Sequence, residues 1–277
     1  MSGAPSVVAE TVRRHDRERY LTALFAPADR RNDLLALYAF NLEIARTRET
    51  VREPMLGHIR LQWWRDALDE IAAGRPPRRH EVVAPLADAV RRHNLARDAF
   101  ERLLLARERD LDDAPFRTLA ELEAYADGTS GALASLALAI LGVADPAMLA
   151  RSRQVGRGYA LTGLLRAAGF HARRNRCLLP EDVLAAHGTG RDAVLAMKPT
   201  PRLAAAVAKI ASVAEAALSP VRVDAAAWPA LAPAVLARRN LKALRRAGHD
   251  LFAPALAAEP GAGAVLALIA ASLGRRA

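Results

Sequence analysis

Apolar residues recur three to four positions apart along most of the chain, which is the spacing of one face of an α-helix. Residues 33–51 carry such a face, made of Leu34, Leu37, Tyr38, Leu42 and Ala45. Residues 57–73 repeat the spacing, and a glycine followed by prolines ends that helix. The alternation of apolar and polar residues that is typical of a β-strand does not stand out in the sequence. The pattern therefore predicts an all-α protein.

The same spacing predicts further helices, and no linker or repeat of fixed period separates them. Thr118 and Glu121 form a capping box at the start of one of these helices. The expected segments are residues 82–93, 96–111, 118–125, 130–141, 147–173, 180–187, 202–218, 230–247 and 262–274. We predict a flexible N-terminal arm at residues 1–14 and one domain at residues 15–277, a single helical bundle of about ten helices.

The 277 residues are 52% hydrophobic but only 5% aromatic, which suits one large helical core. Cys177 is the only cysteine, so an internal disulfide is excluded and a reducing compartment is indicated. The N-terminus lacks an apolar run of signal-peptide length, and the late apolar run at residues 264–273 is too short to span a bilayer. We therefore expect a cytoplasmic protein that is at most peripheral on the inner membrane.

The chain is basic, with 40 Lys and Arg against 30 Asp and Glu, which gives a net charge of +10. This balance suits an anionic membrane surface or a phosphorylated ligand. Nucleic acid is not predicted as a partner, because no reading helix or aromatic stacking pattern accompanies the charge. One basic stripe is either a solvated face or a contact for an anionic membrane or partner, and it comprises Arg238, Arg239, Lys242, Arg245 and Arg246.

Three blocks of sequence carry a family resemblance through their order and spacing. They are RYLTALFAPADRRNDLLALYAFNLEIARTRE at 19–49, IRLQWWRDALDEIAAG at 59–74, and YADGTSGALASLALAILG at 125–142 with VGRGYALTGLLRAAGFHARRNRCLLP at 155–180. Together they resemble the squalene/phytoene synthase family. The resemblance implies an isoprenoid-synthase-like bundle.

The resemblance also implies that this chain has lost the magnesium-binding motifs of the active enzymes. Active members of this family condense two prenyl diphosphates, and two aspartate-rich stretches on facing helices hold the Mg²⁺ ions that bind the diphosphates. Where these stretches would stand, this sequence has Ala45, Arg46 and Glu49, and then Ala167, Phe170 and His171. We therefore expect no metal ligands, no cofactor and no catalytic residue.

The phrases LFAP, LYAFN, RLQWWRDAL and YALTGLLRA look most like the non-catalytic branch of the family, known from mitochondrial assembly factors for respiratory complex I. Our first hypothesis is a non-catalytic protein in the assembly of complex I (NADH dehydrogenase), with its subunits or assembly intermediates as partners. The alternative is a prenyltransferase of squalene/phytoene synthase type in terpenoid biosynthesis, with Mg²⁺ held by Glu49, Asp110 and Asp127. The third is a metal-free binder of a phosphorylated isoprenoid or lipid.

If a ligand binds, the resemblance places it in a degenerate pocket. Its candidate residues are Tyr38, Asn41, Arg46, Glu49, Tyr159, Arg166, His171, Arg173 and Arg174. Simpler interpretations compete: a surface ion-pair set that includes Glu49, a structural hydrogen bond for His171, and a solvated helix end for the last two arginines. Asp110 is predicted to mark a helix terminus rather than a metal cage. Trp63 and Trp64 are adjacent, so one is expected in the core and the other nearer the surface.

Overall fold

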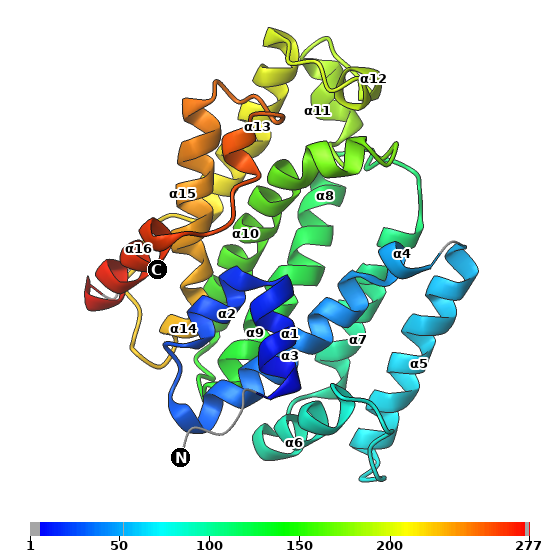
Figure 1. Ribbon diagram of the computed structural model, residues 1–277, viewed down its shortest axis with the longest axis vertical. Helices are drawn as coiled ribbons and strands as arrows, with labels where there is room; N and C mark the ends of the chain where they lie inside the picture. Colours follow the sequence, from blue (N-terminus) through cyan, green and yellow to red (C-terminus); the bar gives the residue numbers. More distant parts are fainter. Residues whose placement is uncertain (1–5, 52, 275–276) are drawn as a thin grey trace.

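The computed structural model describes residues 6–51, 53–274 and 277, and this part of the chain contains helices but no β-strand (Figure 1). This confirms the all-α prediction. The α-helices are α1 Val7–His15, α2 Arg17–Ala23, α3 Ala28–Ala45, α4 Thr47–Thr50, α5 Pro54–Ala72, α6 Val83–His93, α7 Arg97–Glu108, α8 Leu119–Ala126, α9 Ala132–Ile140, α10 Pro146–Ala172, α11 Glu181–Ala186, α12 Arg191–Leu195, α13 Pro201–Ala217, α14 Trp228–Leu231, α15 Pro233–Arg246 and α16 Ala262–Gly274. Short 3₁₀ segments lie at Arg109–Leu111 and Pro254–Leu256, and a π-helical turn at Asp127–Gly131.

The N-terminal region differs from the prediction. Residues 7–14 belong to α1 instead of a flexible arm, and residues 1–5 lie outside the described residues. Ser6 caps α1, and Val8 and Val12 are buried against the bundle. The sequence also suggested fewer and longer helices. The segment expected at 33–51, for example, divides at Arg46 into α3 and the single turn of α4.

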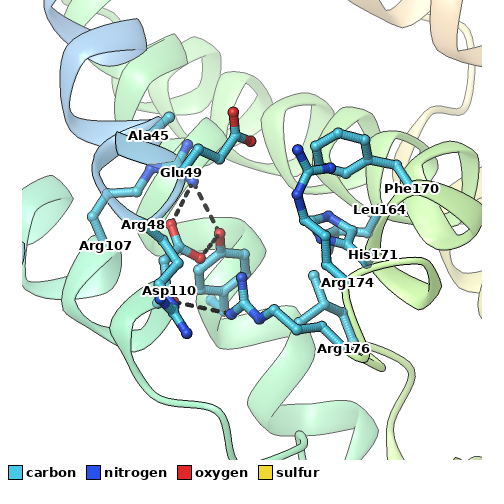
Figure 2. A pocket seen from close by; sticks show the side chains of 12 residues that line it. Ala45, Arg48, Glu49, Arg107, Asp110, Leu164, Phe170, His171, Arg174 and Arg176 are labelled. Atoms are coloured by element: carbon cyan, nitrogen blue, oxygen red, sulfur yellow. Dashed lines mark hydrogen bonds and ion pairs between the residues drawn. The ribbon is translucent and has the colours of Figure 1, made fainter. Parts of the chain in front are cut away.

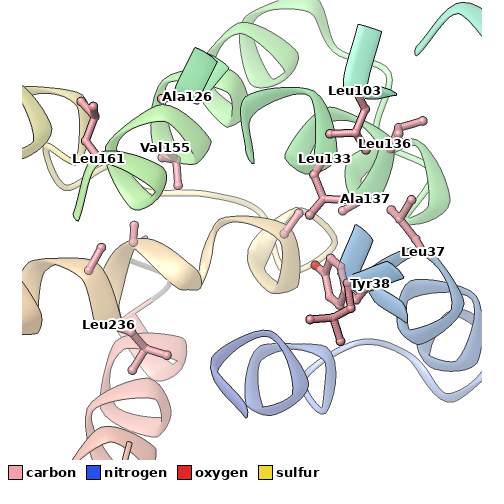
Figure 3. Close-up of a cluster of buried hydrophobic side chains, with 14 of the residues drawn as sticks. Leu37, Tyr38, Leu103, Ala126, Leu133, Leu136, Ala137, Val155, Leu161 and Leu236 are labelled. Carbon is pink, nitrogen blue, oxygen red and sulfur yellow. The ribbon is translucent and has the colours of Figure 1, made fainter. Parts of the chain in front are cut away.

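The core is formed around α10, the longest helix, which packs against α9, α13 and α15 (Figure 1). Leu37 and Tyr38 from α3 meet Leu133 from α9 in this core (Figure 3). Aromatic contacts extend it toward α5 and α7, because Phe40 packs edge-on against Trp64 and Phe100, with ring centroids 5.1 and 5.5 Å away.

The two adjacent tryptophans behave as predicted. The side chain of Trp64 is fully buried in the core. Trp63 is only partly buried and carries the guanidinium of Arg78 at 5.2 Å from its ring centroid. The capping box at α8 is confirmed in one half: Thr118 accepts a hydrogen bond from the Glu121 N–H, whereas the Glu121 carboxylate accepts from the N–H of Arg117.

Glycines in α10 allow neighbouring backbones to approach it closely. A Cβ atom on Gly156 would lie 2.3 Å from the carbonyl oxygen of Ser130 in the π-helical turn. A Cβ atom on Gly158 would lie 2.6 Å from the side chain of Leu218. Gly163, two turns further along the same helix, has no atom within 4 Å of its Cβ direction. The contact between α10 and the π-helical turn therefore depends on the missing side chain at 156.

We predict that Gly156→Ala lowers the free energy of unfolding by about 1–3 kcal/mol, because the added methyl group forces two backbones apart. The matched control is Gly163→Ala, which adds the same group in open space. This control is expected to be neutral or stabilising by up to about 1 kcal/mol through helix propensity. Urea unfolding followed by circular dichroism measures both. Equal effects of the two substitutions would contradict the proposed contact.

Candidate functional site

A cavity of about 430 Å³ opens between α4, α7, α8 and the C-terminal end of α10. We call it the arginine cavity, because four of its lining side chains are arginines. The lining residues are Ala45, Arg48, Glu49, Arg107, Asp110, Tyr125, Leu164, Phe170, His171, Arg174, Arg176 and Leu178. Figure 2 shows two walls, with Arg48, Glu49, Arg107 and Asp110 on one side and Phe170, His171, Arg174 and Arg176 on the other.

Asp110 lies at the end of α7, where the helix tightens into a 3₁₀ turn, and its carboxylate is fully engaged. The Tyr125 hydroxyl donates to Oδ1 at 2.6 Å, and Arg107 Nη1 donates to Oδ2 at 3.1 Å. Arg107 also donates to the Tyr125 oxygen at 2.9 Å. Burial and the neighbouring carboxylate of Asp110 raise the pKa of Tyr125, so its hydroxyl stays protonated as a donor. This carboxylate therefore balances the buried Arg107.

The other arginines are less completely compensated. Arg48 pairs with Asp113 at 3.0 Å, and Arg176 shares the same carboxylate at 3.8 Å. Arg176 also donates to the backbone carbonyl of Asp110 at 2.9 Å. The guanidinium carbon of Arg174 lies 3.8 Å from the ring centroid of Phe170, and within the described residues this group has no ion pair and no hydrogen-bond acceptor. Four guanidinium groups thus share a cavity with two carboxylates, those of Glu49 and Asp110. The cavity is positively charged.

His171 lies beside these cations at the end of α10, against the edge of Phe170. Burial and, to a smaller extent, the positive charge of Arg176 lower the pKa of His171 to about 4. The Nδ1 atom is buried, and within residues 6–51, 53–274 and 277 it has no hydrogen-bond partner. The structural hydrogen bond expected for His171 is therefore not formed at Nδ1. The imidazole is neutral at pH 7 and has an unused polar atom at the cavity wall.

The candidate residues named from the sequence fall in different places. Glu49, His171 and Arg174 line the arginine cavity. Asn41, Tyr159 and Arg166 line an adjoining cavity of about 230 Å³. These two cavities share four lining residues, namely Ala45, Arg107, Tyr125 and Leu164.

The remaining three candidates lie apart from the arginine cavity. Tyr38 is buried and borders only a pocket of about 20 Å³. Burial raises its pKa to about 12. Arg173 lines a different hollow with Met197 and Phe252. Arg46 is half-exposed and lies 3.9 Å from Glu49, so this pair forms the surface ion-pair set that the sequence left open.

The adjoining cavity is lined by charges that compensate one another. Arg166 Nη1 donates to Glu18 Oε1 at 2.7 Å, and Asn240 donates to the same oxygen at 3.3 Å. Arg19 pairs with Asp16 at 2.7 Å and packs over the ring of Tyr159. Arg166, one of the candidate ligand-binding residues, is therefore held by an internal carboxylate. Its charge is less available to a ligand than that of Arg174.

Arg107 and Tyr125 line the arginine cavity but were not predicted from the sequence as ligand-binding residues. Arg107 and Asp110 are spaced for a helical ion pair, and the expected helix terminus at Asp110 is correct. The local pattern does not show that this terminus faces Arg174, which lies just after the end of α10 and some sixty positions later in the chain. Tyr125 is part of the block at residues 125–142 that carries the family resemblance, and its local sequence does not indicate a binding role.

Acidic side chains do not gather into a metal site in the described part of the chain. Within it, no group of three or more His, Cys, Asp or Glu residues is placed to hold a metal ion. Of the three acids named as alternative Mg²⁺ ligands, Glu49 and Asp110 line the arginine cavity. Asp127 belongs to the π-helical turn and forms an ion pair with Arg153 instead.

The fold and the sequence define the class of protein. The chain matches the family model described as squalene/phytoene synthase over residues 12–261, and it belongs to this family. A dehydrosqualene synthase solved in complex with a ligand superposes with a TM-score of 0.82 at 18% identity, covering 96% of this chain and 94% of that one. The expected isoprenoid-synthase-like fold is thereby confirmed.

The most similar curated relatives belong to one group within the family. The chain is 34% identical to complex I assembly factor 6 of Bos taurus over 261 residues, which is 92% of this chain and 78% of the relative. It is 33% identical to the Homo sapiens assembly factor 6, with the same coverage. These matches confirm the likeness to the complex I assembly factors that the sequence blocks indicated.

We predict that His171 makes the protein less stable in mild acid. Its folded pKa of about 4 lies below the ordinary 6.5, so between these values only the unfolded chain binds the proton. The free energy of unfolding should fall by up to about 3 kcal/mol as the pH drops through this window. His171→Gln should lack this component, whereas His58→Gln, at an exposed site, should retain it. An NMR titration midpoint of His171 at or above 6 would contradict the prediction.

Proposed function

We propose that this protein is a non-catalytic member of the squalene/phytoene synthase family that acts in the assembly of respiratory complex I. The observation that carries the proposal is the similarity to assembly factor 6 of Bos taurus across 92% of the chain. We extend to this chain the role for which that relative is named. Complex I subunits or assembly intermediates are the proposed partners.

The chemistry of the arginine cavity supports the non-catalytic part of the proposal. Mg²⁺ requires several oxygen ligands in octahedral geometry, and a diphosphate site in this family would need more than one such ion. Glu49 and Asp110 supply the two carboxylates in the lining of the cavity. The carboxylate of Asp110 already accepts hydrogen bonds from Tyr125 and Arg107. Four guanidinium groups repel a divalent cation. These residues do not fit a magnesium cluster.

The alternative, a prenyltransferase, would need the acids to converge on the diphosphate. The ion pair of Asp127 with Arg153 and the engagement of Asp110 argue against a set formed from Glu49, Asp110 and Asp127. The prenyltransferase is nevertheless included in the tests below, because the chain belongs to the squalene/phytoene synthase family and has the fold of a dehydrosqualene synthase.

We expect that deleting the gene in its own organism lowers the amount of assembled NADH dehydrogenase and leaves the polyprenoid content unchanged. Blue-native electrophoresis with an NADH activity stain measures the first quantity, and lipid extraction with mass spectrometry measures the second. The matched control is re-expression of the intact chain, which should restore assembly.

Two positive findings would contradict this proposal. One is normal complex I with a depleted polyprenoid pool, which would select the prenyltransferase. The other is appreciable head-to-head product when the purified protein is given farnesyl or geranylgeranyl diphosphate with Mg²⁺. A deletion that changes neither the amount of assembled NADH dehydrogenase nor the polyprenoid content would also contradict the assembly role.

A second candidate function is the metal-free binding of a phosphorylated isoprenoid or lipid in the arginine cavity. The observation that favours it is the guanidinium of Arg174, which lies over the ring of Phe170 and lacks a carboxylate partner among the described residues. Guanidinium groups recognise phosphate oxygens bidentately without a metal ion. Leu164, Phe170 and Leu178 supply apolar wall next to the cations. An amphiphile with one phosphate end suits this lining.

We expect farnesyl monophosphate to bind in the presence of EDTA, and Arg174→Gln to weaken binding about tenfold or more through the loss of charge-assisted hydrogen bonds. Arg173→Gln is the matched control, because this neighbour lines a different hollow and should change the affinity less than twofold. Isothermal titration calorimetry measures both. The candidate fails if the unmodified protein shows no binding at millimolar ligand, or if the two variants lose affinity equally.

A further inference from the structure

The C-terminal helix α16 has one apolar face that no other described part of the chain covers. Its residues read AGAVLALIAASLG, without a charged side chain. Ala264 and Leu268 are buried toward the bundle, where α16 packs against α15. Leu266, Ile269 and Leu273 are spaced to share the opposite side, and they are 66%, 44% and 83% exposed. α16 lies on the outside of the molecule (Figure 1).

Basic side chains adjoin this face. A Cβ atom on Gly263 would lie 3.2 Å from Nη2 of Arg239, and Gly263 is three residues before Leu266, on the same side of α16. The guanidinium of Arg239 is thus at the edge of the apolar face. Lys242 and Arg246 follow on the same side of α15 at helical spacing, and both are exposed.

These three cations differ from the other basic residues of α15. Arg245 pairs with Glu215 of α13 at 3.1 Å, and Arg238 donates to the carbonyl of Leu218 at 2.9 Å. By contrast, Arg239, Lys242 and Arg246 form no ion pair with any residue that the structure describes. The predicted basic stripe therefore divides into two sides. One side contacts neighbouring segments of the chain, and the other is available beside the apolar face of α16.

The combination of apolar side chains and uncompensated cations distinguishes between possible occupants. A second copy of the chain, docked through the same face, would place two sets of like charges together, and the net charge of +10 adds to the repulsion. A lipid bilayer with anionic headgroups accepts both features, because leucine and isoleucine enter the interface while Lys and Arg contact the headgroups. No helix in the described residues is long and apolar enough to cross a membrane.

We infer that α16 and the adjoining side of α15 form a docking surface for an anionic lipid bilayer. Leu266, Ile269 and Leu273 enter the interface between headgroups and acyl chains. Arg239, Lys242 and Arg246 lie at the level of the headgroup phosphates. This inference does not depend on the proposed role in assembly or on a ligand in the arginine cavity.

The test is flotation of the full chain with vesicles of phosphatidylcholine that contain one-third phosphatidylglycerol. We expect binding to these vesicles and little binding to pure phosphatidylcholine. Leu266→Glu/Ile269→Glu should reduce the bound fraction at least tenfold. The matched control is Met55→Glu/Ile59→Glu, which places the same charges on another exposed apolar pair, in α5, and should leave binding unchanged.

The basic side of the surface is tested in the same assay. Arg239→Gln/Lys242→Gln should reduce the partition coefficient on the order of 10- to 30-fold, since each basic residue near an anionic surface contributes roughly fivefold. Arg245→Gln removes one charge from the same helix but on the side that faces α13, and it should have little effect. Circular dichroism checks that every variant is folded.

A second measurement reports on α16 directly. Cys177 is buried, so Cys177→Ser with Leu273→Cys allows a polarity-sensitive fluorophore to be attached at position 273 alone. Its emission should shift to the blue with anionic vesicles only. The inference is overturned if the unmodified chain does not float, if the α5 control loses binding equally, or if the fluorophore does not respond. It is also overturned if the face instead mediates dimers that Leu266→Glu/Ile269→Glu dissociates.

Discussion

The structure depends on how closely other backbones can approach α10. This helix is central and long, and it supplies Leu164, Phe170 and His171 to the arginine cavity. It reaches that position because Gly156 allows the carbonyl of Ser130 to lie where a side chain would otherwise stand. The π-helical turn before α9 fits this approach, since its wider backbone lies directly against α10. The close contact between Gly156 and Ser130 therefore helps to set the position of the arginine cavity.

The second constraint is the balance of charge inside the bundle. Where a carboxylate is available, an arginine is neutralised and becomes part of the scaffold, as with Arg166 and Glu18 or Arg107 and Asp110. Where none is available, the guanidinium remains a potential ligand group, as at Arg174. Arg174 is exposed, so water solvates its charge when no ligand is present, and the group stays available to an anion beside the neutral His171.

Charged side chains on the outer surface are divided in the same way. Arg245 and Arg238 are used to attach α15 to its neighbours, while Arg239 stands beside the apolar face of α16. Two sides of one helix therefore carry similar charge but have different environments. A count of basic residues cannot separate them, because the distinction arises from what each side chain contacts.

The sequence by itself determined the all-α class, the long helix at α10, the burial of one tryptophan of the adjacent pair, and the family. These properties depend on local periodicity, on capping and on blocks of residues read in order, so they need no knowledge of distant contacts. It missed the helix at residues 7–14, whose apolar pattern is short and is stabilised by packing on the bundle. Only the tertiary structure decided which arginines are paired. Arg166, Arg173 and Arg174 are near neighbours in sequence, yet within the described residues only Arg166 meets a carboxylate, that of Glu18. The reason is physical: the charge state and availability of a side chain are set by groups that lie far along the chain and close in space.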